Sequence, residues 1–171
     1  QDDDVALPPG AAVLTKPFFP SMLKQKIEAV RGVDAEGDDD LAQVLSGKHF
    51  LAAEDNFLNA GILTDLLEME GATVEIVENG KLAVERFERC EPGEFDAILM
   101  DVQMPRMDGY EATRRIRALS DKEKASVPIV AMTANAFEDD RKNALNAGMN
   151  GHIAKPLDLP KLFRVLSELM R

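Results

Sequence analysis

The feature that most constrains the fold of this chain is an alternation of short apolar runs with longer amphipathic runs, which begins at residue 49. The apolar runs are rich in β-branched and aliphatic residues, as is typical of strands buried on both faces of a parallel sheet. Five strand-then-helix units predict an α/β fold, namely a doubly wound five-stranded parallel sheet with five helices on its two faces. The predicted strands are His49–Ala53, Thr73–Val77, Ala97–Met100, Val127–Met132 and His152–Ala154.

The amphipathic runs between these strands predict the five helices. In the first helix Leu58, Ile62, Leu66 and Met69 share an apolar face, and Gly71 supplies the stop. The remaining helices are expected at about residues 81–90, 110–119, 137–147 and 159–169.

Composition excludes several classes of protein. The 171 residues hold 20 Lys and Arg against 31 Asp and Glu, a net charge of −11, which disfavours nucleic acid and anionic membranes as partners. A single cysteine, Cys90, excludes an intrachain disulfide and fits a reducing, cytoplasmic compartment. No apolar run is long enough to cross a bilayer, so we expect no direct membrane contact by this fragment. The chain starts with Gln1 rather than Met, which favours a piece of a longer protein.

Polar and charged residues that can bind ligands or take part in reactions follow four of the predicted strands. Glu54 and Asp55 end the first strand, Asp101 the third, Thr133 the fourth and Lys155 the fifth. The carboxyl ends of strands in such a sheet meet at one edge, where ligands bind. Taken singly, each residue also has an ordinary structural interpretation, such as a helix cap for the acids or a solvated surface lysine.

Taken together, these residues predict a phosphoryl-accepting site. Three carboxylates in one crevice repel one another, and a hard cation such as Mg²⁺ relieves the repulsion. A carboxylate can act as a nucleophile toward phosphorus. Mg²⁺, the Lys155 ammonium and the Thr133 hydroxyl with a backbone N–H could neutralise the three phosphoryl oxygens. We therefore expect phosphate on Asp101, with Mn²⁺ as the alternative metal.

Four stretches of the chain resemble the receiver domain of two-component response regulators. The most specific is Asp101-x-x-Met104-Pro105-x-Met107-Asp108-Gly109, and the others are residues 51–56, 128–136 and 147–156. The resemblance covers about residues 48–170 and implies a flavodoxin-like strand order of 2-1-3-4-5. The residues around Thr133 and Lys155 are most similar to the receivers of hybrid sensor histidine kinases.

The resemblance also implies a role for each acid. Asp101 matches the phosphoacceptor, and Asp55 and Asp101 match the direct Mg²⁺ ligands. The backbone carbonyl of Gln103 matches a third protein ligand, and Glu54 matches an acid that acts through metal-bound water.

At the remaining positions the family pattern implies a switch. Thr133 matches the hydroxyl that turns toward the phosphoryl group, and Lys155 matches the ammonium, with a cis bond to Pro156. The rotating switch residue of the family is commonly Tyr or Phe, and here it is His152. His152 is therefore either a switch that can also titrate near neutral pH or an outward-facing residue at the sheet edge.

The first 47 residues are expected to differ from the receiver at 48–171. Residues 12–31 predict a strand and an amphipathic helix, and 32–47 an acidic linker. The segment that begins Lys16-Pro17 aligns with the one that begins Lys155-Pro156, so 1–47 is either a linker or the remnant of a preceding receiver.

We expect a phosphorelay module that receives its phosphoryl group from a histidine kinase or histidine phosphotransfer domain. It would catalyse its own phosphorylation and hydrolysis, and the full-length protein would be a hybrid histidine kinase. The sequence does not determine the oligomeric state; the surfaces that a dimer would use are the fourth helix with the fifth strand, or the N-terminal segment. The alternatives are a Mg²⁺-dependent aspartyl-phosphate phosphohydrolase and a binding module that works without phosphate.

Overall fold

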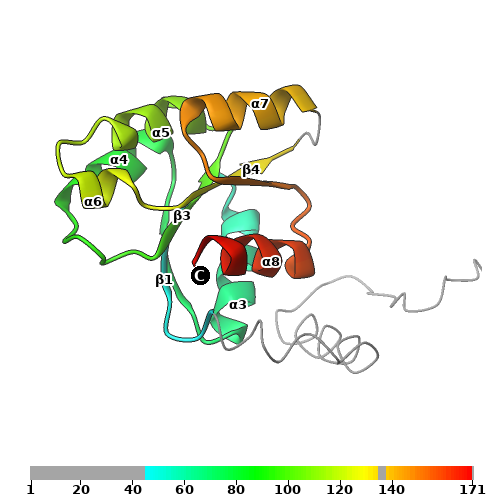
Figure 1. Ribbon diagram of the computed structural model, residues 1–171. Coiled ribbons are helices and arrows are strands. Elements are labelled where there is room, and N and C mark those ends of the chain that lie inside the picture. Colours follow the sequence, from blue (N-terminus) through cyan, green and yellow to red (C-terminus); the bar gives the residue numbers. More distant parts are fainter. Residues whose placement is uncertain (1–44, 135–137, 171) are drawn as a thin grey trace, which may run out of the picture. The chain divides into compact units, whose positions relative to one another are not determined.

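A computed structural model describes residues 45–134 and 138–170 of the chain. In these residues, helices and strands alternate as the sequence predicts (Figure 1). The predicted strand and helix at 12–31, and the linker up to residue 44, lie outside the described residues. The elements in chain order are β1 His49–Ala53, α3 Phe57–Met69, β2 Thr73–Val77, α4 Gly80–Arg89, β3 Ala97–Asp101, α5 Gly109–Arg117, α6 Lys122–Ala125, β4 Ile129–Thr133, α7 Glu138–Ala147, β5 Gly151–Ala154 and α8 Leu159–Leu169.

The five strands form one parallel sheet in the order β2-β1-β3-β4-β5. This order confirms the doubly wound, flavodoxin-like fold. The register aligns the strands so that Ala53 pairs with Met100, and Asp101 with Met132. The ends of β1, β3 and β4 therefore lie level with one another at the carboxyl edge of the sheet.

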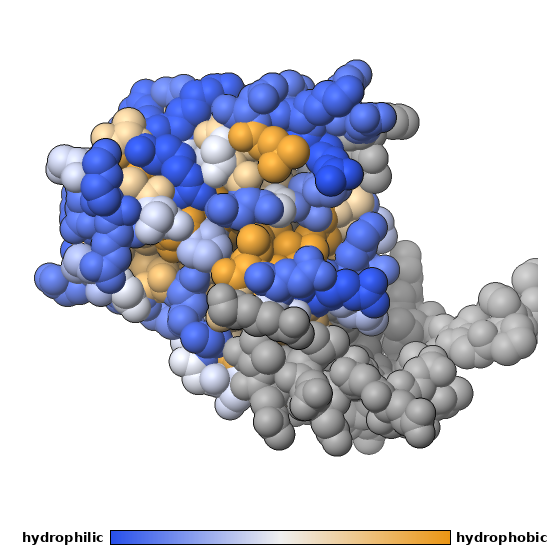
Figure 2. Space-filling model, in the orientation of Figure 1, coloured by the Kyte–Doolittle hydropathy of each residue, from blue (hydrophilic) through white to orange (hydrophobic). Residues whose placement is uncertain are grey.

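Two hydrophobic cores, one on each face of the sheet, hold the helices in place. Along β1, Leu51 and Ala53 face one core and Phe50 and Ala52 the other, the alternation that a strand covered on both faces requires. Helices α4, α5 and α7 cover the first face, and α3 and α8 cover the second (Figure 1). In Figure 2 hydrophobic surface gathers between α7 and α8, while most of the remaining visible surface is hydrophilic.

The buried face of α3 differs from the predicted one. The buried residues are Ala60, Leu63, Leu66 and Leu67, so of the predicted stripe only Leu66 is buried. Leu58 is 72% exposed and Ile62 is 42% exposed, so the predicted apolar stripe was wrong. This helix has apolar residues on more than one face, and its packing against the sheet chooses between the overlapping stripes.

For the other helices and strands, most of the predicted first and last residues lie within two residues of the observed ones. Strand β4 begins at Ile129 rather than Val127, because Pro128 has no N–H to donate to a neighbouring strand. In the described part of the chain a sixth helix, the single turn α6, adds to the five predicted ones. Its N-cap is Asp121, whose carboxylate accepts from two backbone N–H groups.

Residues just before the predicted start of the domain also take part in the fold. Leu45 is fully buried in the core beneath α3 and α8, and the Gly47 N–H donates to the Gly71 carbonyl at 2.8 Å. The division into 1–47 and 48–171 stays a prediction. Among the residues that the structure describes, no helix is long and apolar enough to span a membrane.

Candidate functional site

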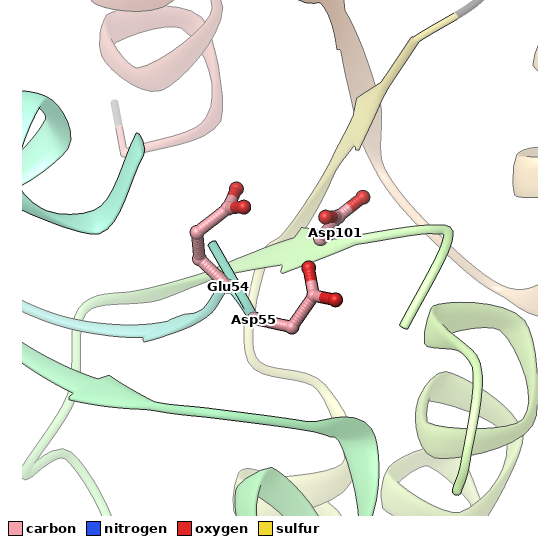
Figure 3. Close-up of side chains that lie close together, drawn as sticks. All are labelled: Glu54, Asp55 and Asp101. Carbon is pink, nitrogen blue, oxygen red and sulfur yellow. The ribbon is translucent and has the colours of Figure 1, made fainter. Parts of the chain in front are cut away.

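Three carboxylates lie together at the carboxyl edge of the sheet. Glu54 and Asp55 follow β1 and Asp101 ends β3, and one oxygen from each lies within 4.8 Å of the others. In Figure 3 the three side chains point toward a common space between the two strand ends. Glu54 and Asp101 are only 3% and 5% exposed, whereas Asp55 is exposed. The site is therefore two buried acids with a third at its mouth.

Lys155 joins the two buried acids. Its Nζ donates to Glu54 Oε2 at 2.6 Å and to Asp101 Oδ2 at 2.7 Å. The loop after β5 carries Lys155 to this position, and the Lys155 N–H donates to the Thr133 carbonyl at 2.7 Å. The bond between Lys155 and Pro156 is cis, as expected.

Burial and the ion pairs act in opposite directions on these groups. Burial raises the pKa of Asp101 above its usual value, although the hydrogen bond from Lys155 partly counters it. For Lys155, burial alone would lower the pKa, but the hydrogen bonds to Asp101 and Glu54 outweigh it and raise the pKa. Lys155 is thus a charged ammonium at neutral pH, and its charge favours the ionised form of Asp101.

The first turn of α3 holds Glu54 from its other side. Neither Glu54 nor Asp55 caps this helix, because its N-cap is Asn56, which accepts from the N–H groups of Leu58 and Asn59. Glu54 Oε1 instead accepts from the Asn56 N–H and from Asn59 Nδ2, both at 3.2 Å. Sequence reasoning missed Asn59, although a polar residue one turn into the helix that follows an acid was a usable signal.

The other predicted residues differ in their distance from the acids. The Gln103 N–H donates to Asp101 Oδ1 at 3.1 Å, so the backbone of Gln103 lies at the site. Thr133 is buried at the end of β4, one residue beyond the partner of Asp101.

His152 lies farther back along its strand than these residues. It pairs with Ala131 and lines a hollow of about 90 Å³ beside Arg141 and Leu145 of α7. The structure therefore places His152 under α7 rather than among the acids.

A glycine allows the close packing behind the phosphoacceptor candidate. A Cβ on Gly109 would lie 2.3 Å from the Asp101 carbonyl oxygen, closer than real Cβ atoms approach. The Gly109 N–H donates to the Val102 carbonyl at 3.0 Å. The start of α5 thus lies directly against the backbone that carries Asp101, which explains the glycine at this position.

The charges of the site fit a divalent cation. Three carboxylates and one ammonium sum to −3 + 1 = −2. All candidate ligands are oxygens, which Mg²⁺ prefers, and few carboxylates are needed because Mg²⁺ keeps several waters. The residues present therefore fit Mg²⁺ by charge and by donor type.

Comparisons with known proteins agree with this geometry. The family model of the response regulator receiver domain matches residues 50–167. Probable histidine kinase 2 of Oryza sativa subsp. indica is 41% identical over 125 residues, which cover 67% of this chain and 12% of that protein. This chain thus spans about an eighth of that relative's length.

Two solved structures of bacterial and yeast origin are also similar. The receiver domain of a sensor histidine kinase from Pseudomonas aeruginosa, with a magnesium ion in its active site cleft, is 42% identical with a TM-score of 0.65, covering 73% of this chain and 98% of that one. The Saccharomyces cerevisiae receiver domain of Ssk1, solved in complex with the histidine phosphotransfer protein Ypd1, is 31% identical with a TM-score of 0.63, covering 71% and 88%. The family match over most of the chain, together with the fold and the acidic site, shows that the chain belongs to the response regulator receiver domains of two-component phosphorelays.

Proposed function

We propose that this receiver takes a phosphoryl group from phosphohistidine onto Asp101 and that Mg²⁺ is required. The observation that carries the proposal is the group of three carboxylates within 4.8 Å of one another, two of which, Glu54 and Asp101, bind the ammonium of Lys155. Asp55, Asp101 and the Gln103 carbonyl would hold the cation directly, and Glu54 would hold it through water. Mg²⁺ supplies positive charge that neutralises the phosphoryl oxygens, and Mn²⁺ can take its place because it also prefers oxygen ligands.

The transfer exchanges one bond to phosphorus for another. A carboxylate oxygen of Asp101 forms the new bond as the bond between phosphorus and the histidine nitrogen breaks. The electron pair of the broken bond stays on the imidazole. Lys155 stays beside Asp101 and neutralises negative charge on the phosphoryl group. The Thr133 hydroxyl donates to a phosphoryl oxygen.

Thr133 and His152 would pass the change to the surface. Thr133 would move toward the phosphoryl group, and because β4, which it ends, pairs with β5, this movement would shift β5, where His152 lies beneath α7. This surface, together with the exposed Leu145, is our candidate for partner contacts and for a dimer.

The exposed side of α3 is our candidate docking surface for the phosphohistidine partner. Phe57 is 87% exposed, and with Leu58 and Ile62 it forms an apolar group on the helix that begins two residues after Asp55. A hollow of about 140 Å³, lined in part by Ile62, Lys155 and Leu157, continues this surface to the site. An apolar surface next to the acids suits a histidine kinase or histidine phosphotransfer domain, the kind of partner seen with the yeast receiver.

The setting of the whole protein follows from its relatives. We propose a hybrid histidine kinase as the full-length protein, because the curated relatives are histidine kinases several times longer than this chain. The receiver would work in the cytoplasm, a reducing compartment in which the free thiol of Cys90 is stable.

Intact mass spectrometry after incubation with acetyl phosphate and Mg²⁺ tests the proposal. The wild-type protein is expected to gain one phosphoryl group that hydroxylamine removes, and Asp101→Asn is expected to gain none. Asp139→Asn on the exposed side of α7 is the matched control and should behave as wild type.

Four outcomes contradict the proposal. One is a gain that does not need Mg²⁺, and another is a gain that survives in Asp101→Asn. The third is no gain from acetyl phosphate or from a phosphorylated histidine phosphotransfer domain in a folded protein, which would favour a phosphate-independent binding module. Continuous release of phosphate from generic phosphate esters would favour a phosphohydrolase.

A further inference from the structure

Glu54 is held by three hydrogen bonds, and only one of them comes from Lys155. Oε2 accepts from Lys155 Nζ at 2.6 Å, while Oε1 accepts from the Asn56 N–H and from Asn59 Nδ2. Because a carboxylate is only an acceptor, the Asn59 amide must present its NH₂ group to it. Asn59 is thus the one side chain besides Lys155 for which the structure gives a hydrogen bond to Glu54 in the described residues.

The start of α3 explains how Asn59 reaches Glu54. Asn59 is the third residue of the helix after the N-cap Asn56. At this position Glu or Gln commonly accepts from the N–H of the N-cap residue. Here Glu54 takes over that acceptor role from outside the helix, and the Asn59 amide donates to it instead. The N-cap residue Asn56 and the acid Glu54 thus belong to a single hydrogen-bond network.

We propose that Asn59 is a positioning residue for phosphoryl transfer. Its amide fixes the orientation of the Glu54 carboxylate, and this orientation sets where Lys155 and the water shell of the cation can lie. The proposal rests on the proposed function of the site. Without Asn59, Oε1 keeps only the backbone N–H of Asn56, and rotation of the Glu54 side chain would pull Lys155 Nζ away from Asp101.

The position of Asn59 also demands a test that separates positioning from docking. Asn59 is half-buried and lines the same hollow as Ile62 and Lys155, where we place the phosphohistidine partner. Acetyl phosphate needs no docking surface. Its rate of reaction therefore reports on the site alone.

The experiment compares Asn59→Leu, which keeps the branched shape and the number of non-hydrogen atoms but removes the donor, with Asn143→Leu on the exposed side of α7. Mg²⁺ affinity is measured by isothermal titration calorimetry and phosphorylation by the rate with acetyl phosphate. We expect Asn59→Leu to weaken Mg²⁺ binding and slow phosphorylation by about tenfold each, the lower end of losses seen for residues that orient metal ligands. Asn143→Leu should match the wild type. Asn59→Ala, checked for folding by thermal melting, repeats the test without the added apolar surface.

A double-mutant cycle shows whether Asn59 acts through Glu54. In a Glu54→Ala background, Asn59→Leu should change Mg²⁺ affinity by less than about twofold, because the group that it positions is gone. A full tenfold effect in that background would overturn the proposal, as would wild-type Mg²⁺ affinity in Asn59→Leu. A loss confined to transfer from a phosphohistidine domain would also overturn it and assign Asn59 to docking. If the wild-type protein takes no phosphoryl group, the proposed function fails, while Mg²⁺ affinity still reports on Asn59.

Discussion

The amino and carboxyl ends of the parallel sheet differ in whether their carboxylates are balanced by nearby cations. Toward the amino ends of the strands, Arg86 forms ion pairs with Glu75 in the middle of β2 and with Glu94 before β3, and it lies over the ring of Phe95. Lys48 forms an ion pair with Asp96 at 2.9 Å. Each of these carboxylates has a cation beside it. The hydrogen bond from Arg86 lowers the pKa of Glu94, as expected of an acid with a partner.

At the carboxyl ends the balance is missing. Three carboxylates lie together, the ammonium of Lys155 pairs with Glu54 and Asp101 only, and the pKa of Asp101 is raised by burial rather than lowered. Charges that the protein balances internally serve the fold, whereas a buried excess of one sign costs stability and is kept where a ligand supplies the missing charge. The difference between the two ends thus locates function without reference to any relative.

Lys155→Met should produce the largest loss of stability. The substitution leaves the buried carboxylates of Glu54 and Asp101 without their cation, which costs about 3 kcal/mol of unfolding free energy in metal-free buffer. Urea denaturation with and without Mg²⁺ measures it, and Mg²⁺ should recover part of the loss. An equal loss in both buffers would show that Lys155 matters for packing and not for charge.

Arg117→Met should cause the largest loss of stability at the amino ends of the strands. Arg117 donates to the carbonyls of Ala125, Val127 and Gly148, each at 2.8 Å, so its loss strips donors from three backbone groups. We expect a loss of about 2 kcal/mol in urea denaturation and unchanged Mg²⁺ affinity. The exposed Arg114→Met is the matched control and should cost less than about 0.5 kcal/mol. Weakened Mg²⁺ binding in Arg117→Met would mean that the two ends are coupled.

Removing one carboxylate should change the free energy of unfolding differently at the two ends. Asp55→Asn relieves repulsion at the acidic site, so metal-free stability should stay equal or rise by up to about 1 kcal/mol. Glu75→Gln removes a partner of Arg86 and should cost about 0.5 kcal/mol.

Mg²⁺ sharpens the same test. At a concentration 100 times its dissociation constant, Mg²⁺ should stabilise the wild type by about 2.7 kcal/mol, and Asp55→Asn should lose most of this gain. Thermal melting with and without Mg²⁺ gives both results. A metal-free loss in Asp55→Asn as large as in Glu75→Gln would erase the distinction between the ends.

The smallest effect is expected from His152 and pH. Burial lowers the pKa of His152, and the nearby Arg141 and Lys161 add to this. The folded state therefore binds the proton less tightly than the unfolded chain. The contribution of neutral His152 to stability is fully present above the ordinary pKa of histidine. It is lost as the pH decreases through the lowered pKa of the folded state. Between pH 7.5 and pH 5.5 the urea midpoint of the wild type should drop more than that of His152→Phe. Equal drops would remove His152 as the cause.

Much of the fold could be predicted because strand and helix periods are local. Thr73–Val77 reads as a strand from five neighbouring residues, and β2 begins and ends there. The acids and Lys155 were found at strand ends for the same reason, since topology brings such ends together. The face of α3 could not be predicted, because Leu58 and Leu63 are equally apolar and only packing on the sheet separates them.

By itself the sequence determined where the strands end and which acids, hydroxyl and lysine stand there. Only the tertiary structure decided that Lys155 bridges Glu54, 101 residues away in the chain, and Asp101. It also decided that Asn56 rather than an acid caps α3, and that Asn59 reaches back to Glu54. The physical reason is that residue type and spacing set local conformation, whereas hydrogen bonds and charge balance depend on distances in space that the packed sheet alone creates.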